Sequence, residues 1–400
     1  MLAHHNVRRA LAPISRGLLA LLALLAVVGT TAGRRAMAQE TRGATPPTSV
    51  AGDPDLPYAA MAGRVVAALR PSAGERALLR VDRSVLPRLE PALRGALEAS
   101  GVKVETLDYG PQPDFAAALE RASIYVWLPT GPSARPTPEQ QGALRGWLGT
   151  GRGSQVHFHW TGITTGTDGF PVAIPPELDA LHARALEVDY ARLRRELQAA
   201  ANVLRAGEIR VTTPRGTDLR FRIGDRAISL QDGDASREHL RGKPLPVDRE
   251  VELPAGVLRV APLEETVDGT LVVPMLRLSP TDTARMVRLD FVRGEVARVS
   301  ADSKAGLVLD SVLARFPAQR HFRELGIGFN PVLAVARDAV VIPYAGYGAG
   351  VVRLSLGDNT ELGGKVQGGA SRWLFFPDAT VTVGSTVLVK DGRLQPQNAR

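Results

Sequence analysis

The sequence contains no cysteine among its 400 residues. Disulfide bonds, thiolate metal sites and a cysteine nucleophile are therefore excluded. A glycine-rich phosphate-binding fingerprint is also missing after the first strand-like run, because residues 81–85 read Val-Asp-Arg-Ser-Val. A dinucleotide site of the usual type is not expected at this position.

Clustered positive charge is also missing beyond the N-terminus. Residues 1–38 contain five arginines and no acidic residue, so their removal lowers the net charge from +8 to +3. No block of like charges follows. Nucleic-acid binding requires a basic face, and we therefore predict no nucleic-acid partner.

The N-terminal 38 residues have the pattern of a signal peptide. A basic start with arginines at positions 8, 9 and 16 precedes an apolar run at 18–28, and Ala-Met-Ala at 36–38 offers a cleavage site. The apolar run is shorter than the roughly 20 residues that a membrane span needs. We predict export from a bacterial cytoplasm, periplasmic or secreted, with no membrane span after cleavage. An uncleaved anchor remains the alternative, and the choice between general and twin-arginine export stays open.

Three further segments follow from composition and periodicity. Residues 39–55 are rich in Thr, Pro, Gly and Ala and predict a flexible linker. Residues 56–185 alternate helical and strand patterns, which predicts an α/β domain with a parallel sheet. Residues 186–400 carry period-2 runs, including a predicted hairpin at 209–223, and indicate an α+β domain with mostly antiparallel strands. One long amphipathic helical stretch at 178–204 is expected to bridge the two domains.

Four short motifs occur in order in the second half. They are Leu-Pro-Ala-Gly at 253–256, Glu-Leu-Gly-Ile-Gly-Phe-Asn-Pro at 324–331, Leu-Gly-Asp-Asn at 356–359 and Gly-Gly-Lys at 363–365. In this order the chain resembles the thermophilic metallo-aminopeptidase family, that is, aminopeptidase T and its leucyl aminopeptidase-like relatives. The resemblance implies a metal-bearing second domain, peptide ligands, a homodimer, and two divalent cations (zinc, cobalt or manganese) held by carboxylates and histidines.

Most of the ligand positions that the resemblance implies carry the wrong side chain. They are Val257, Glu324, Arg353, Ser371 and Trp373. Of these five residues, only Glu324 has the carboxylate that the resemblance implies as a metal ligand. Arg353 instead adds a permanent positive charge. At about 4 Å and an effective dielectric constant near 20, repulsion between a guanidinium and a divalent ion costs roughly 8 kcal/mol, whereas complete structural zinc sites gain about 10–16 kcal/mol.

We therefore expect no metal cofactor at these positions and interpret the chain as an exported pseudo-peptidase whose cleft serves binding or assembly. Arg353 is expected to replace the cation and to pair with Glu324 at hydrogen-bond distance. Two alternatives remain: an active exported metallo-aminopeptidase that releases N-terminal amino acids using other ligands, and an unrelated hydrolase built around Ser371. The second alternative lacks a histidine partner for the serine.

Other candidate residues have simpler interpretations. His157 and His159 share one face of a predicted strand, a spacing that can chelate zinc or copper. Because the sequence identifies no third ligand, we interpret them as a solvated or hydrogen-bonded pair. His321 is interpreted as an ordinary surface histidine. The glycine clusters at 344–350 and 363–369 could line a cleft, but glycine at this density is more typical of turns.

Overall fold

The computed structural model describes residues 55–131, 136–175, 177–243, 245–279, 281–302, 305–369 and 371–397. The predicted signal peptide and all but residue 55 of the predicted linker lie outside these ranges. The described residues belong to one compact unit that spans residues 46–400. Among them, no helix has both the length and the apolar character needed to cross a membrane.

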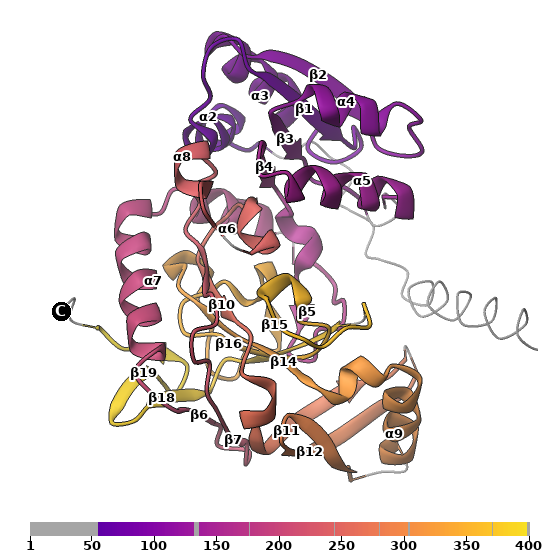
Figure 1. Ribbon diagram of the computed structural model, residues 1–400, viewed down its shortest axis with the longest axis vertical. Coiled ribbons are helices and arrows are strands. Elements are labelled where there is room, and N and C mark those ends of the chain that lie inside the picture. The colour runs from indigo at the N-terminus through magenta and orange to yellow at the C-terminus, as the bar shows by residue number, and fades with distance from the viewer. Residues whose placement is uncertain are drawn as a thin grey trace, which may run out of the picture. The chain divides into compact units, whose positions relative to one another are not determined.

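The N-terminal part forms the parallel α/β sheet that the alternating pattern predicts (Figure 1). Its strand order is β2-β1-β3-β4-β9, and all four pairings are parallel. The strands are β1 (Arg76–Val81), β2 (Lys103–Asp108), β3 (Ile124–Trp127), β4 (Ser154–His157) and β9 (Glu250–Glu252), and the helices are α2 (Tyr58–Leu69), α3 (Leu89–Ala99), α4 (Phe115–Arg121) and α5 (Pro138–Gly149).

The two faces of this sheet pack against different hydrophobic clusters. On one face, Leu79 and Val126 belong to the large core that includes residues of α2 and α3. On the other face, Leu78 and Tyr125 pack with residues of α4 and α5. Because side chains alternate along a strand, Arg80 and the residues in register with it share this second face.

Residues 178–204 form two helices rather than the single stretch expected. The helices are α6 (Leu178–Ala185) and α7 (Tyr190–Leu204). The Asp189 carboxylate accepts a hydrogen bond from the backbone N–H of Arg192 at 2.9 Å and so caps the start of α7. A capping aspartate satisfies one of the free N–H groups at a helix start, which favours a new helix at this point.

The second half is mostly antiparallel, as predicted, and β9 is the exception because it joins the parallel sheet. One sheet has the order β17-β16-β14-β10-β8 and another has β13-β12-β11-β7-β6-β18-β19-β20, and their pairings are all antiparallel. The predicted hairpin is β6 (Ile209–Thr212) with β7 (Asp218–Phe221). The other strands are β8 (Ser229–Gln231), β10 (Val257–Val260), β11 (Asp268–Arg277), β12 (Thr283–Val292), β13 (Glu295–Ser300), β14 (Phe322–Gly328), β16 (Val352–Gly357), β17 (Ser371–Phe376), β18 (Thr380–Val383), β19 (Thr386–Lys390) and β20 (Arg393–Leu394).

Short elements complete the chain. Strands β5 (Thr165–Gly166) and β15 (Val341–Ile342) pair with each other, and the remaining helices are α8 (Arg237–Leu240) and α9 (Ala305–Arg315). The 3-10 turns are η1 (Trp160–Ile163), η2 (Pro246–Arg249), η3 (Glu264–Thr266), η4 (Pro317–Arg320), η5 (Pro331–Leu333), η6 (Tyr344–Gly346) and η7 (Thr360–Leu362).

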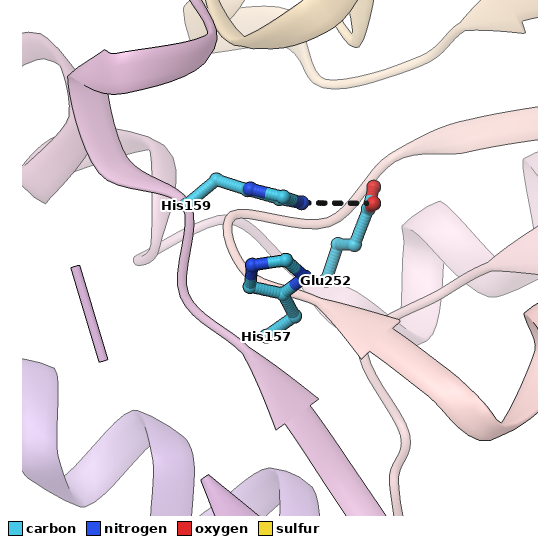
Figure 2. Close-up of side chains that lie close together, drawn as sticks. All are labelled: His157, His159 and Glu252. Carbon is cyan, nitrogen blue, oxygen red and sulfur yellow. Dashed lines mark hydrogen bonds and ion pairs between the residues drawn. The ribbon is translucent and has the colours of Figure 1, made fainter. Parts of the chain in front are cut away.

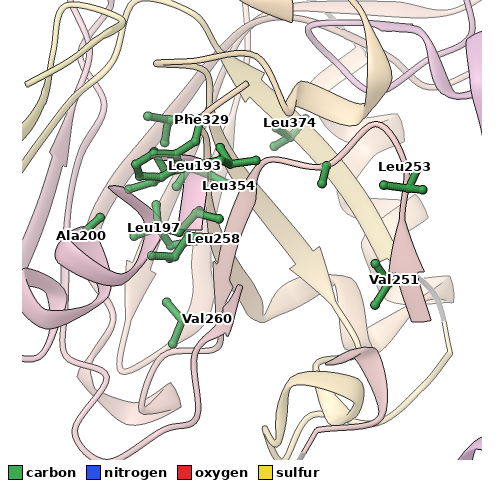
Figure 3. Close-up of a cluster of buried hydrophobic side chains, with 14 of the residues drawn as sticks. Leu193, Leu197, Ala200, Val251, Leu253, Leu258, Val260, Phe329, Leu354 and Leu374 are labelled. Atoms are coloured by element: carbon green, nitrogen blue, oxygen red, sulfur yellow. The ribbon is translucent and has the colours of Figure 1, made fainter. Parts of the chain in front are cut away.

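One hydrophobic core connects the two predicted domains. Leu193 and Leu197 of α7 belong to the same buried cluster as Leu258 of β10 and Val251 of β9 (Figure 3). Strand β9 lies in the second predicted domain by sequence but completes the parallel sheet of the first. The boundary at residues 185 and 186 stays a prediction, because the core continues across it.

Candidate functional site

The structure brings the five residues at the implied ligand positions into one connected group. Val257 and Trp373 belong to one apolar cluster. The guanidinium carbon of Arg353 lies 5.0 Å from the centroid of the Trp373 ring. Arg353 also contacts Glu324, and Ser371 joins the group by accepting a hydrogen bond from Arg323 at 3.2 Å.

Glu324 lies at the centre of this group and is fully buried. Its Oε2 accepts hydrogen bonds from Nη2 and Nε of Arg259 at 2.9 and 3.2 Å. Its Oε1 lies 2.9 Å from Nε of Arg353, so the expected ion pair between Arg353 and Glu324 is confirmed. The Arg353 N–H does not point at the carboxylate, so this contact is an ion pair without a linear hydrogen bond. Ser355 donates to Oε1 at 3.3 Å.

Two further residues extend the cluster. Nη1 of Arg323 lies 3.7 Å from Oε2 of Glu324. The Glu361 carboxylate contacts both Arg259, at 2.5 Å, and Arg323. We call Arg259, Arg323, Glu324, Arg353 and Glu361 the arginine cluster. Three guanidinium groups face two carboxylates, which leaves the cluster positive.

The pKa shifts in the arginine cluster follow from burial and pairing. Burial alone would raise the pKa of Glu324, but Arg259, Arg353 and Arg323 hold it well below its ordinary value. Burial lowers the pKa of Arg353 to about 10, because its pairing with Glu324 only partly offsets the loss of water. Arg259 has two carboxylate partners, and these raise its pKa despite burial. Glu324, Arg353 and Arg259 are therefore charged near neutral pH.

Sequence reasoning missed Arg259, Arg323 and Glu361. Arg259 follows Val257 by two residues on one strand, so the period-2 rule could have placed it on the same face. Arg323 could not be found in this way, because neighbours on a strand normally point to opposite faces. The register between β14 and β16 shifts between Phe322 and Glu324, and such a bulge turns a side chain toward the wrong face.

The implied pair of divalent cations does not fit this arrangement. The carboxylate of Glu324 already contacts guanidinium nitrogens on both oxygens. Val257 and Trp373 belong to the same apolar cluster and offer no lone pair to a cation. A cation here would face the positive charges of Arg259 and Arg353 at short range, which is strongly unfavourable.

The glycine-rich segment at 344–350 contacts the Arg353 side chain through its backbone. Ala345 within it accepts a hydrogen bond from Nη1 of Arg353 at 3.2 Å. A Cβ on Gly348 would lie 2.0 Å from the carbonyl oxygen of Leu333, so only glycine permits this backbone approach. In the second glycine cluster, a Cβ on Gly364 would lie 2.1 Å from the Asn359 side chain. Close backbone packing therefore accounts for these two glycines.

A second group of polar residues lies at the carboxyl ends of β4 and β9. His157 of β4 is in register with Glu252 of β9. His159 follows two residues later, and its Nε2 lies 3.2 Å from Oε1 of Glu252. One ligand atom from each of these three residues lies within 4.8 Å of the others (Figure 2). We call His157, His159 and Glu252 the histidine cluster.

The interpretation of His157 and His159 as a hydrogen-bonded pair is confirmed, because they contact Glu250 and Glu252. The structure adds Glu252 as a possible third ligand that the sequence did not identify. Among the described residues, the histidine cluster is the one group of three His, Cys, Asp or Glu side chains that could hold a metal ion. Glu252 was missed because it lies 93 residues from His159 in the chain. Only the parallel pairing of β4 with β9 brings it close, and a three-residue strand gives a weak sequence signal. His321 is not part of this group.

A cavity of about 310 Å³ is lined in part by Glu361 of the arginine cluster and by Glu250, a neighbour of the histidine cluster. Its walls include Tyr109, Phe115, Tyr125 and Trp127, together with Arg80, Gln140, Glu250 and Glu361. Glu250 contacts His157, and Glu361 belongs to the arginine cluster. The cavity therefore connects the sheet face that carries Arg80 with the charged groups of the second half.

The wall residue Gln140 is held by the start of α5. Its backbone N–H donates to Thr137 Oγ1 at 3.3 Å, while its side-chain oxygen accepts from the Thr137 N–H at 3.1 Å. This reciprocal cap fixes the first turn of the helix. The Gln140 amide then donates to the Gly110 carbonyl at 2.9 Å, and its side-chain oxygen accepts from Arg80 at 3.3 Å.

No protein-family model matches the chain, and no curated protein matches it. Two solved structures resemble it over most of its length. One is the 2,5-dihydroxypyridine dioxygenase from Pseudomonas putida KT2440, with a TM-score of 0.59, 18% identity, and coverage of 84% of this chain and 96% of that chain. The other is wild-type AmpT from Thermus thermophilus, with a TM-score of 0.52, 16% identity, and coverage of 84% and 98%. At these identities the likeness shows the fold alone, and that fold is aminopeptidase-like.

Proposed function

We propose that this protein is an exported, aminopeptidase T-like pseudo-peptidase that has lost the dinuclear metal centre and uses its cleft for binding. The main support is the buried Glu324, whose carboxylate pairs with guanidinium groups where the resemblance implies a metal ion. The two structural neighbours carry names that denote different chemistries, so their shared fold does not select a reaction.

The ligand proposed for the cavity is an amino acid or a short peptide with free termini. The cavity has the size of a small-molecule site. Arg80 is buried, and within the described part of the chain its Nη1 has no hydrogen-bond partner. It would receive a carboxylate, while Glu250 and Glu361 would attract an ammonium group. The aromatic walls would accept an apolar side chain.

The full chain should show no chelator-sensitive hydrolysis of amino-acid anilides when zinc, cobalt or manganese is added. Val257, Arg353, Ser371 and Trp373 supply none of the carboxylate or imidazole donors that such a centre needs. Release of the anilide chromophore measures the rate. Hydrolysis that a chelator abolishes and that added metal restores would instead support the alternative, an active metallo-aminopeptidase.

Ligand binding can be measured separately by titration calorimetry. A dipeptide with an aromatic side chain and free termini should bind the full chain, and the same dipeptide with both termini blocked should bind at least about tenfold more weakly, because charged hydrogen bonds contribute roughly 1.5–3 kcal/mol each. The substitution Arg80→Met should reduce binding similarly, whereas Arg121→Met, on the surface of α4, should not. Equal binding of free and blocked dipeptides would refute this ligand class.

Export and dimerisation are further parts of the proposal. N-terminal sequencing of the exported protein should begin at residue 39, as the cleavage pattern predicts. Finding Met1 on the exported protein would favour the anchor.

Light scattering should give the mass of a homodimer, and a monomer mass would remove that part of the proposal.

A further inference from the structure

The histidine cluster has the composition of a metal site. Two imidazoles and one carboxylate converge from neighbouring parallel strands, and their ligand atoms all lie within 4.8 Å of one another. An ion with bonds of about 2.0–2.1 Å spans donors up to about 4.2 Å apart. Small side-chain rotations would therefore close the group around one ion.

Glu250 orients the buried histidine of the cluster. The Nδ1 of His157 lies 2.6 Å from Oε1 of Glu250, which leaves Nε2 as the free ring nitrogen. A carboxylate on the second nitrogen is the usual partner of a histidine that binds a metal, because it fixes the tautomer and the ring plane. Trp127 adds to this by stacking on the His157 ring, with centroids 4.1 Å apart and planes at 11°.

The two imidazole rings lie close together beside Glu252. Their centroids lie 3.4 Å apart, and Figure 2 shows the two rings next to each other, with His159 directed at the Glu252 carboxylate. His159 and Glu252 are partly exposed, at 21% and 17% of the side chain, so an ion has a path to them.

We propose that His157, His159 and Glu252 bind one divalent transition-metal ion of the zinc type, with Glu250 positioning His157 from outside the ligand set. This site is separate from the five positions of the aminopeptidase resemblance and does not depend on the proposed function. Imidazole and carboxylate donors suit Zn²⁺ and its neighbours in the first transition series. Three protein ligands would leave a further position open for water or for a ligand atom.

The nearby arginines disfavour a cation at the histidine cluster less than they do at the five positions of the aminopeptidase resemblance. Arg259 and Arg353 interact electrostatically with Glu252, but both contact Glu324 directly. Arg259 also pairs with Glu361. Each of these two guanidinium groups thus already has a carboxylate partner in the arginine cluster. The carboxylates of Glu250 and Glu252 lie against the histidines themselves and favour a cation there.

The test is a titration of the full chain, purified without a polyhistidine tag and stripped of metal by a chelator. Co²⁺ absorption reports binding, and Zn²⁺ competes against a chromophoric chelator. We expect one ion per chain. His159→Ala should weaken binding by about 100-fold or more, Glu252→Gln by a similar factor, and Glu250→Gln by about tenfold. Circular dichroism confirms that each variant is folded.

His321→Ala is the matched control, because it removes a histidine outside the cluster and should leave the affinity unchanged. His4 and His5 of the leader are present in every variant and contribute equally. The proposal is overturned if the wild-type chain binds no ion, or if His159→Ala and Glu252→Gln bind as tightly as His321→Ala. Anilide hydrolysis that persists in His159→Ala would refute the pseudo-peptidase function alone, so the two failures are distinguishable.

Discussion

Replacing Glu324 with glutamine is expected to lower the free energy of unfolding by about 3–5 kcal/mol, because breaking a buried ion pair leaves its partner charged and uncompensated. Arg259 and Arg353, which are 5% and 2% exposed, both contact this carboxylate. Glutamine keeps the size of the side chain but removes its charge. Urea denaturation followed by circular dichroism measures the change.

Glu361→Gln is the matched control for this variant. Glu361 contacts the same arginines, but its side chain is 45% exposed, so water screens the contact. Its loss should cost about 1 kcal/mol or less. If the two variants were equally destabilised, the buried carboxylate would not be the centre of the cluster.

The pH dependence of the wild-type protein provides a second measurement on the same residue. The three arginines hold the pKa of Glu324 below its ordinary value of 4.5. A carboxylate with a depressed folded-state pKa stabilises the protein above the unfolded-state pKa, and this contribution is lost as the pH falls toward the folded-state value. The wild-type protein should therefore lose stability below about pH 4.5 more steeply than Glu324→Gln does.

Arg353→His should destabilise the protein by roughly 2–4 kcal/mol and should not create a metal-dependent peptidase. The imidazole is too short to replace the contacts of the guanidinium with Glu324 and with the Ala345 carbonyl. Arg259 and Arg323 would remain near the carboxylate and would continue to repel a cation. Urea denaturation and the anilide assay with added zinc measure the two outcomes.

Arg353→Lys tests whether the charge alone is sufficient. Lysine keeps the positive charge but lacks the planar fork that reaches two partners at once. We expect it to lose less stability than Arg353→His does. A stable Arg353→His variant that hydrolyses anilides in the presence of zinc would show that the arginine blocks an otherwise functional metal centre.

The sequence predicted the features that depend on local pattern. Alternating helix and strand periods predicted the parallel sheet, and period-2 runs predicted the antiparallel half. The pairing of Glu324 with Arg353 was also predicted, because a buried carboxylate needs a counter-charge and the resemblance placed an arginine beside it. These inferences need only the chemistry of single residues and their order.

The remainder depended on geometry that the sequence does not show. The bulge at Arg323 reverses the face expected from alternation. The short strand β9 brings Glu252 to His157, although the pattern of residues 250–252 does not distinguish a strand from a loop. The break before α7 depends on the local competition of the Asp189 side chain for backbone N–H groups. Each case is decided by one or two residues in a particular three-dimensional setting.

Strand β9 also has a consequence for the order in which the chain can fold. During synthesis, β4 is complete long before β9 emerges, since Glu250 lies 93 residues after His157. Until then β4 has an unpaired edge, which is a template for association with other chains. Long-range pairings of this kind also form slowly. A nascent or translocating chain that stops before residue 250 therefore exposes the unpaired backbone groups of β4. We expect holding chaperones to bind the chain during this interval.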